Sequence, residues 1–268
     1  MPLAVLAQSE VYHTFYDPTA PVTATPWLLF TILKMLIVFT VLMVGVAMLT
    51  LAERKISAWI QDRIGPNRTG YGGLLQPAAD GLKNIMKEET YPDAANMPLF
   101  ILAPMLSFIP ALITFAVIPF AAPLSTRWGL VEMSVASVPV GFLYILAISS
   151  LGVYGIVLAG WSSNNKYSLL GGLRSSAQMI SYEIAMGMAA VSVLLLSGNV
   201  SLPEIVKQQQ AMGWNVFPLL IGFFIFCVAA FAETNRLPFD LPEAESELIA
   251  GYHTEYSAMK FSMFFIAE

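Results

Sequence analysis

Acidic side chains gather in one short stretch of this sequence, ETNRLPFDLPEAESELIAGYHTE, which runs from Glu233 to Glu255. Apolar runs that are long enough to cross a bilayer lie on both sides of it. Because a carboxylate is costly near hydrocarbon, a chain that crowds carboxylates at a membrane boundary is expected to use them. The chemistry that this pattern favours is the handling of protons or cations. The six acids in these 23 residues are Glu233, Asp240, Glu243, Glu245, Glu247 and Glu255.

Two prolines and a capping pattern divide this acidic stretch. Pro238 and Pro242 prevent a continuous helix from the preceding apolar run. Asp240 followed by Glu243 fits a capping box, so Asp240 is expected at the N-cap of a new helix, with a functional role equally open. On that helix Glu243 and Glu247 share one face, and carboxylates this close titrate as a coupled set. The alternative is a solvated acidic turn that the helix dipole favours.

Three other charged residues lie at or inside apolar runs. Glu183 lies about two turns into such a run, where an ionisable group costs roughly 2.5–3.5 kcal/mol on insertion. It is either a functional carboxyl or a structural one bonded to a neighbouring Tyr or Ser. Lys34 either reaches back to the membrane surface or forms a buried ion pair. Glu53 belongs either to a local charge network or to a functional site.

The composition indicates a polytopic membrane protein. The chain has 268 residues, of which 57% are hydrophobic and 12% are charged, and its mean hydropathy is +0.68. Soluble domains carry about twice that charged fraction. The net charge of −5 argues against nucleic-acid binding. The single cysteine, Cys227, allows no internal disulfide, and no cluster of Cys and His suggests a bound metal.

The fold class expected from the apolar pattern is an all-α transmembrane helix bundle with five full spans and the start of a sixth. A span needs about 20 apolar residues. The sixth run begins near Ala258 and stops at Glu268, so the chain is expected to be a fragment of a longer protein that lacks its last spans. The five predicted spans are Trp27–Ala52, Met97–Phe120, Val135–Ala159, Ala177–Leu196 and Trp214–Ala232.

The basic residues predict the orientation of this single transmembrane domain. Nine Lys and Arg residues fall in the connections on one side, and only Arg127 and Lys207 fall on the other. By the positive-inside rule the loop 233–257 is cytoplasmic, and the 26 N-terminal residues lie outside. No basic stretch at the N-terminus indicates a signal peptide.

Residues 53–96 are expected to lie on the cytoplasmic side as a helix extension and an amphipathic helix. After Ala52 the helical spacing continues to Ile64, where Gly65-Pro66-Asn67 stops it. A helix from Trp27 to Ile64 would be about 57 Å long, nearly twice the hydrocarbon thickness. The apolar spacing between Leu75 and Met86 then predicts a short amphipathic helix at the membrane interface.

At three motifs the sequence resembles a known family. The motifs are LAERKISAWIQDRIGPNRTGYGGLLQPAADGLKNIMKEE (51–89), GWSSNNKYSLLGGLRSSAQMISYE (160–183) and AETNRLPFDLPEAESELIAGYHTEYSAMKFSMFFIAE (232–268). They are similar to the H subunit, or subunit 1, of the proton-translocating NADH–quinone oxidoreductase of bacterial inner membranes, respiratory complex I. The likeness covers nearly the whole chain past residue 27, and family members continue with further spans.

The resemblance implies a membrane protein that forms the quinone-access cavity and couples quinone reduction to proton translocation. It implies an enzyme of the translocase class in which this chain performs no bond chemistry, so no catalytic residue is expected here. By residue match the quinone cavity would be lined by Glu53, Arg54, Arg63, Asp80, Phe261, Phe265 and Ile266. The proton path would be formed by Glu183, Glu233, Asp240, Glu243, Glu245, Glu247, Glu255 and Glu268.

The same resemblance implies the ligands and partners. Quinone would be the substrate, ubiquinone or menaquinone, and this chain would bind no metal or cofactor itself. NADH, FMN and the iron–sulfur clusters would belong to partner subunits in the peripheral arm, and further membrane-arm subunits and lipid would surround the chain. Three alternatives remain open: the anchor subunit of a membrane-bound hydrogenase or related ferredoxin- or F420-linked complex, a standalone ion carrier, and a purely structural anchor.

Overall fold

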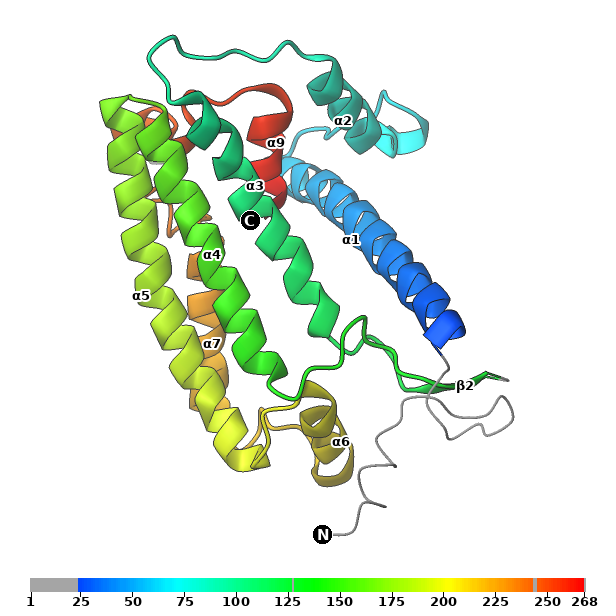
Figure 1. Cartoon of the computed structure of the whole chain (residues 1–268). Coiled ribbons are helices and arrows are strands. Elements are labelled where there is room, and N and C mark those ends of the chain that lie inside the picture. Colours follow the sequence, from blue (N-terminus) through cyan, green and yellow to red (C-terminus); the bar gives the residue numbers. More distant parts are fainter. Residues whose placement is uncertain (1–23, 127, 243–244, 268) are drawn as a thin grey trace.

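The computed structural model of the chain describes residues 24–126, 128–242 and 245–267, and it is mainly helical, with almost no sheet (Figure 1). In chain order its helices are α1 (Ala24–Ile60), η3 (Tyr71–Gly73), α2 (Gln76–Met86), α3 (Met97–Thr114), η4 (Phe115–Val117), α4 (Gly141–Ser162), α5 (Lys166–Ser197), α6 (Leu202–Met212), α7 (Leu220–Glu233), α8 (Glu245–Leu248), η5 (Gly251–His253) and α9 (Ala258–Ala267). Two short antiparallel strands, β1 (Leu124–Thr126) and β2 (Gly129–Val131), pair Leu124 with Val131.

The predicted class, a polytopic all-α membrane protein, is confirmed. Among the described residues, α1, α3, α4 and α5 are each long and apolar enough to cross a membrane. The helices α7 and α9 are apolar but shorter. Helices α3, α4, α5 and α7 form a bundle in which chain neighbours pack side by side, and α9 packs on α3 (Figure 1).

Several predicted helix boundaries are wrong, and the local sequence explains them. The third and fifth spans were predicted from Val135 and Trp214, but their helices begin at Gly141 and Leu220, just beyond Pro139 and Pro218. A residue before proline avoids the helical conformation, and proline cannot donate a backbone hydrogen bond. With 14 residues α7 is about 21 Å long, which is shorter than the hydrocarbon core.

Helix α5 begins eleven residues before the predicted fourth span. The hydrophobic pattern missed its first three turns because the side chains there are small or polar. Gly171, Gly172 and Ser175 are buried in this part of α5. Their small size lets the neighbouring backbone approach closely, so these turns pack well without apolar side chains.

The first helix is long, as predicted, but it ends at Ile60 and not at Ile64. The chain turns at Asp62, whose φ of 51° is left-handed and ends the helix. The 37 residues of α1 span about 55 Å. Only 6% of the most apolar stretch of α1 is buried, against 33% for α3, so α1 lies against little of the described chain.

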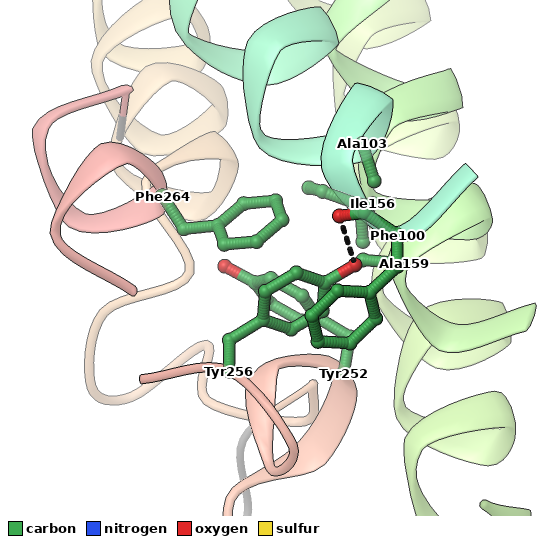
Figure 2. Close-up of a cluster of buried hydrophobic side chains, with 7 residues drawn as sticks. All are labelled: Phe100, Ala103, Ile156, Ala159, Tyr252, Tyr256 and Phe264. Carbon is green, nitrogen blue, oxygen red and sulfur yellow. Dashed lines mark hydrogen bonds between the residues drawn. The ribbon is translucent and has the colours of Figure 1, made fainter. Parts of the chain in front are cut away.

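The core of the fold includes the segment that follows α7. Tyr252 and Tyr256 come from this segment and are buried among residues of α3, α4 and α9 (Figure 2). The ring of Tyr256 stacks on Phe100 with centroids 4.0 Å apart, and its hydroxyl donates to the Phe100 carbonyl over 3.2 Å. The acidic stretch is therefore connected to a segment that packs inside the bundle, not to a wholly solvated loop. The rest of the cluster is Ala103, Ile156, Ala159 and Phe264.

Candidate functional site

Charged residues from three segments meet where α1 ends. Arg236, which follows α7, pairs with Glu53 on α1 over 3.0 Å between Nη1 and Oε1. The guanidinium of Arg236 also lies 5.8 Å from the ring centroid of Phe265 on α9. Glu53, Arg236 and Asp240 line a groove of about 530 Å³ together with Phe231, Asn235 and Leu237. We call this groove the junction groove.

A second ion pair joins α1 to the amphipathic helix α2. Arg54 pairs with Asp80, which also accepts a hydrogen bond from Gln76 over 3.1 Å. Partial burial works to raise the pKa of Asp80, but the hydrogen bonds from Arg54 and Gln76 and the charge of Lys83 outweigh it and lower the pKa. Asp80 is thus held as a carboxylate beside the end of α1.

The apolar residues predicted for the quinone cavity lie on α9 and next to the loop. Phe261 and Phe265 contact each other with ring centroids 4.9 Å apart, and each also lies against the ring of His253. Ile266 is half-buried on the same helix. Arg63 differs from the rest, because its Nε bonds Gln61 two residues earlier and its side chain is exposed, away from the junction groove.

The bundle contains a second, partly open space, which we call the inner cavity. Its volume is about 220 Å³, enough for several water molecules. Five hydroxyl-bearing side chains and one carboxylate, that of Glu233, line it among mostly apolar neighbours. The hydroxyl-bearing residues are Ser107, Thr114, Ser149, Thr234 and Tyr252.

Glu233 lines the inner cavity, and Glu183 lies next to Ser149, which is another lining residue. The hydroxyl of Ser149 is 3.5 Å from Glu183 Oε1, and Ser149 itself lines the cavity that Glu233 faces. The two carboxylates are close enough for their charges to interact. The structure therefore brings together two of the predicted proton-path residues around a space that can hold water.

The remaining predicted acids divide into two groups. Glu247 pairs with Arg174 on α5 over 2.6 Å, and Glu255 accepts a hydrogen bond of 2.6 Å from Asn165, the N-cap of α5. Both acids therefore hold the loop to α5. Glu243 and Glu268 lie outside the described residues, and of Glu245 only the backbone, at the start of α8, is described.

The predicted capping role of Asp240 is wrong. Leu241 and Pro242 would be the first helical residues after such a cap, but both lie in a turn. The capping-box pattern failed because Pro242 starts a turn here and not a helix. Asp240 contributes to the junction groove, and its Oδ1 is buried without a hydrogen-bond partner among the described residues.

Lys34 binds backbone carbonyls and forms no ion pair within the described part of the chain. Its Nζ donates to the carbonyls of Glu132 and Ser134 over 3.0 and 2.7 Å. These carbonyls follow strand β2, so the side chain reaches toward one end of the bundle, as the snorkelling alternative requires. Its role is to attach α1 to the β-hairpin.

Sequence reasoning missed two residues of the site. Arg236 was used only as evidence for orientation, although it is the single basic residue in the acidic stretch and so the obvious partner for one of the acids. Gln178 on α5 gave no signal, because one amide in a helix is not a pattern. Its partners come from residues 54 to 61 positions away. Among the described residues no group of acidic, Cys and His side chains could hold a metal ion.

The comparisons with known proteins agree with one another. A family profile described as NADH dehydrogenase matches residues 33–268. The H 1 subunit of the NADH-quinone oxidoreductase of Cytophaga hutchinsonii is 52% identical over 231 residues, which cover 86% of this chain and 68% of that protein. The H subunit of Leptospira biflexa (strain Patoc 1 / Ames) is 53% identical, covering 88% and 69%, and the H 2 subunit of Koribacter versatilis is 51% identical, covering 90% and 72%. The chain therefore belongs to the NADH dehydrogenase family, among the H subunits of NADH–quinone oxidoreductase, respiratory complex I.

Proposed function

We propose that this chain lines the access path of a quinone and couples quinone reduction to proton movement through its carboxylates. The proposal that a quinone and complex I are involved rests on the names of its relatives. The observation that carries the coupling is the position of Glu233 and Arg236, three residues apart. Glu233 faces the inner cavity, and Arg236 pairs with Glu53 at the junction groove. One turn of chain thus touches both spaces.

The junction groove supplies charges that a quinone headgroup can influence. Reduction of a quinone to a quinol takes up two electrons and two protons. Residues that supply these protons would change their charge during the reaction. The pairs Glu53–Arg236 and Arg54–Asp80 lie at the end of α1, and the rings of Phe261 and Phe265 offer an apolar surface beside them. A change of charge in such a site acts strongly on neighbouring ions wherever water is scarce.

The inner cavity supplies the next step of the proposed proton path. Water in the cavity, held by the hydroxyls of Ser149 and Thr234, would connect Glu233 with Glu183 by hydrogen bonds. A proton can move along such a chain when one carboxyl takes it up and the other releases it. Because the two carboxylates interact, the protonation of one depends on the other.

The same proposal includes the surroundings of the chain. The end with α2 and the segment 233–257 would face the cytoplasm and the peripheral arm, and the N-terminus would lie outside, as the basic residues indicate. The exposed apolar face of α2, with Leu82, Ile85 and Met86, would rest at the membrane surface. Lipid and other membrane-arm subunits would cover α1.

Neutral replacements in the assembled bacterial enzyme test the proposal. Glu233→Gln and Glu183→Gln keep the side-chain shape but cannot exchange a proton at this position, so we expect proton translocation to fall at least about tenfold, with quinone reduction slowing because the two are coupled. Both rates are measured in proteoliposomes. The matched control is Glu204→Gln on α6, an exposed acid at the other end of the bundle that pairs with Lys207.

Two outcomes would contradict the proposal. Wild-type quinone reduction and wild-type proton translocation in both variants would remove these residues from the proton path. Poor assembly with normal translocation per quinone in the complexes that do form would show instead that the acids serve only to anchor the chain.

A further inference from the structure

One face of α5 holds the segment that follows α7. Arg174, Gln178 and Tyr182 are spaced four residues apart, so they lie above one another on the helix. Arg174 pairs with Glu247 on α8, and the ring of Tyr182 meets the ring of Phe239 edge-on with centroids 5.4 Å apart. Gln178 lies between these two contacts and is the buried member of the three.

The carboxamide nitrogen of Gln178 lies within hydrogen-bond distance of three oxygens around the end of α7, so one of its two N–H groups is shared between two acceptors. Its Nε2 lies 3.0 Å from the carbonyl of Ala232, 3.1 Å from Asn235 Oδ1 and 2.8 Å from the carbonyl of Phe239. Gln178 is 7% exposed, so water cannot easily replace it as a donor. The Ala232 carbonyl belongs to the last turn of α7, and it also accepts a backbone hydrogen bond from the N–H of Asn235 over 3.4 Å.

These three acceptors enclose the two residues on which the proposed function depends. Glu233 follows Ala232 directly, and Arg236 follows Asn235 directly. A side chain that binds residues 232, 235 and 239 therefore fixes the turn that aims Glu233 at the inner cavity and Arg236 at Glu53. Backbone hydrogen bonds from Asn235 to Ala232 and from Phe239 to Arg236 shape the turn itself, and Gln178 joins this turn to α5.

We propose that Gln178 is a positioning residue that holds Glu233 and Arg236 as one unit, so that a change at the junction groove reaches the inner cavity. This inference rests on the proposed function. Gln178 itself touches neither space: it lines neither the inner cavity nor the junction groove. Its effect acts through the turn, and it should therefore change coupling more than it changes quinone binding.

Two substitutions that keep the size of the Gln178 side chain separate the contribution of its N–H groups from that of its packing. Gln178→Met keeps the length but removes the N–H groups, and Gln178→Glu replaces them with a carboxylate that faces three acceptors. The matched control is Gln210→Met on α6, where the same chemical change occurs at an exposed site. The assembled enzyme is reconstituted in proteoliposomes, and protons translocated per quinone reduced, KM for quinone and hydrogen exchange of residues 232–241 are measured.

We expect the number of protons translocated per quinone reduced to decrease from the wild type to Gln178→Met and further to Gln178→Glu. KM for quinone should change less than twofold, and faster hydrogen exchange should be confined to residues 232–241. Gln210→Met should match the wild type in all three. A wild-type proton-to-quinone ratio in both Gln178 variants would overturn the inference. So would a lower ratio without faster exchange in this segment.

Two further variants test the inference if the Gln178 variants do not assemble, and distinguish its failure from failure of the proposed function. If the Gln178 variants do not assemble, Asn235→Gly removes one of the three acceptors while allowing the left-handed φ of 51° at this position. It should show a smaller effect of the same kind, and an unchanged ratio would overturn the inference. Glu233→Gln in the same preparation separates the proposed function from the role of Gln178. If Glu233→Gln translocates protons normally, the proposed function fails. If Glu233→Gln is impaired and the Gln178 variants are not, only the role of Gln178 fails.

Discussion

Burial changes the acid–base behaviour of individual residues around the loop. Tyr256 is an example, because burial raises its pKa to about 12 although Ser162 lies within hydrogen-bond distance. The phenol therefore stays protonated and keeps its hydrogen bond to the Phe100 carbonyl at physiological pH. At Glu89 the pKa is lowered by hydrogen bonds from Lys260 and Tyr91, which keep it charged. Each of these residues serves to hold the loop and α9 in place.

His253 should make the loop sensitive to acid. Burial lowers the pKa of His253 from 6.5 to about 4, so between these values the unfolded loop binds more protons than the folded one. The stability of the loop is therefore complete above pH 6.5 and decreases as the pH falls toward 4, by about 3 kcal/mol at most. We expect hydrogen exchange of residues 251–256, corrected for its intrinsic pH dependence, to accelerate over this range.

The variant His253→Phe is the control for this pH dependence. It keeps an aromatic ring beside Phe261 and Phe265 and removes the titrating group. If exchange in this variant accelerates in acid as much as in the wild type, another group causes the effect.

Among the elements, α5 contributes most to the placement of the site. It carries Glu183, it binds the turn after α7 through Gln178, and its first turns pack against η5. The approach of η5 is very close: a Cβ built on Gly171 would lie 2.6 Å from the Cα of Gly251 and from the nitrogen of Tyr252. Backbone meets backbone here, so no side chain can move aside.

Two glycine substitutions on α5 should have opposite effects. Alanine is favoured over glycine inside a helix by about 1 kcal/mol, so Gly187→Ala, where the nearest atom is 3.9 Å away, should stabilise α5. At Gly171 the same change must displace η5, and such overpacking costs about 1–3 kcal/mol. We expect Gly171→Ala to accelerate hydrogen exchange of residues 251–256 and to lower the temperature of inactivation, with Gly187→Ala unchanged or improved. Equal behaviour of the two variants would contradict the close packing of α5 and η5.

Across the whole molecule, α1 is attached to the rest mainly near its two ends. At one end Lys34 donates to the carbonyls of Glu132 and Ser134, and the ring of Phe30 lies 5.6 Å from that of Trp128. At the other end Glu53 and Arg54 make the ion pairs at the junction groove and with α2. Exposed ion pairs contribute only about 0–1 kcal/mol each, so the attachment at Lys34 is expected to be the stronger of the two.

Replacing Lys34 should therefore loosen the attachment of α1 to the β-hairpin. Hydrogen bonds to charged groups contribute about 1.5–3 kcal/mol, so Lys34→Met should accelerate hydrogen exchange around residues 129–134 by about tenfold to a hundredfold. Lys207→Met on α6 is the control, because Lys207 pairs with an exposed acid one turn away. Unchanged exchange in Lys34→Met would show that the apolar contacts of Phe30 suffice.

Composition and local pattern predicted a large part of this fold. The helical class, the long α1, the amphipathic α2 and the start of α9 near Ala258 follow from hydrophobic spacing, which is a property of neighbouring residues. The boundaries at Asp62, Gly141 and Leu220 were predicted less well, because a left-handed residue or a proline overrides the apolar pattern over a few positions. The first turns of α5 were missed because close packing, not hydrophobicity, stabilises them.

The sequence by itself determined which residues are ionisable, that the chain is a multi-pass membrane protein, and that acids crowd after α7. Those are consequences of side-chain chemistry and of the cost of burying charge, and both can be read from one chain. Only the tertiary structure decided which charges meet. The pairing of Glu53 with Arg236, the cavity shared by Ser149 and Glu233, and the three bonds of Gln178 join residues far apart in sequence, and no local pattern records contacts that arise when helices pack.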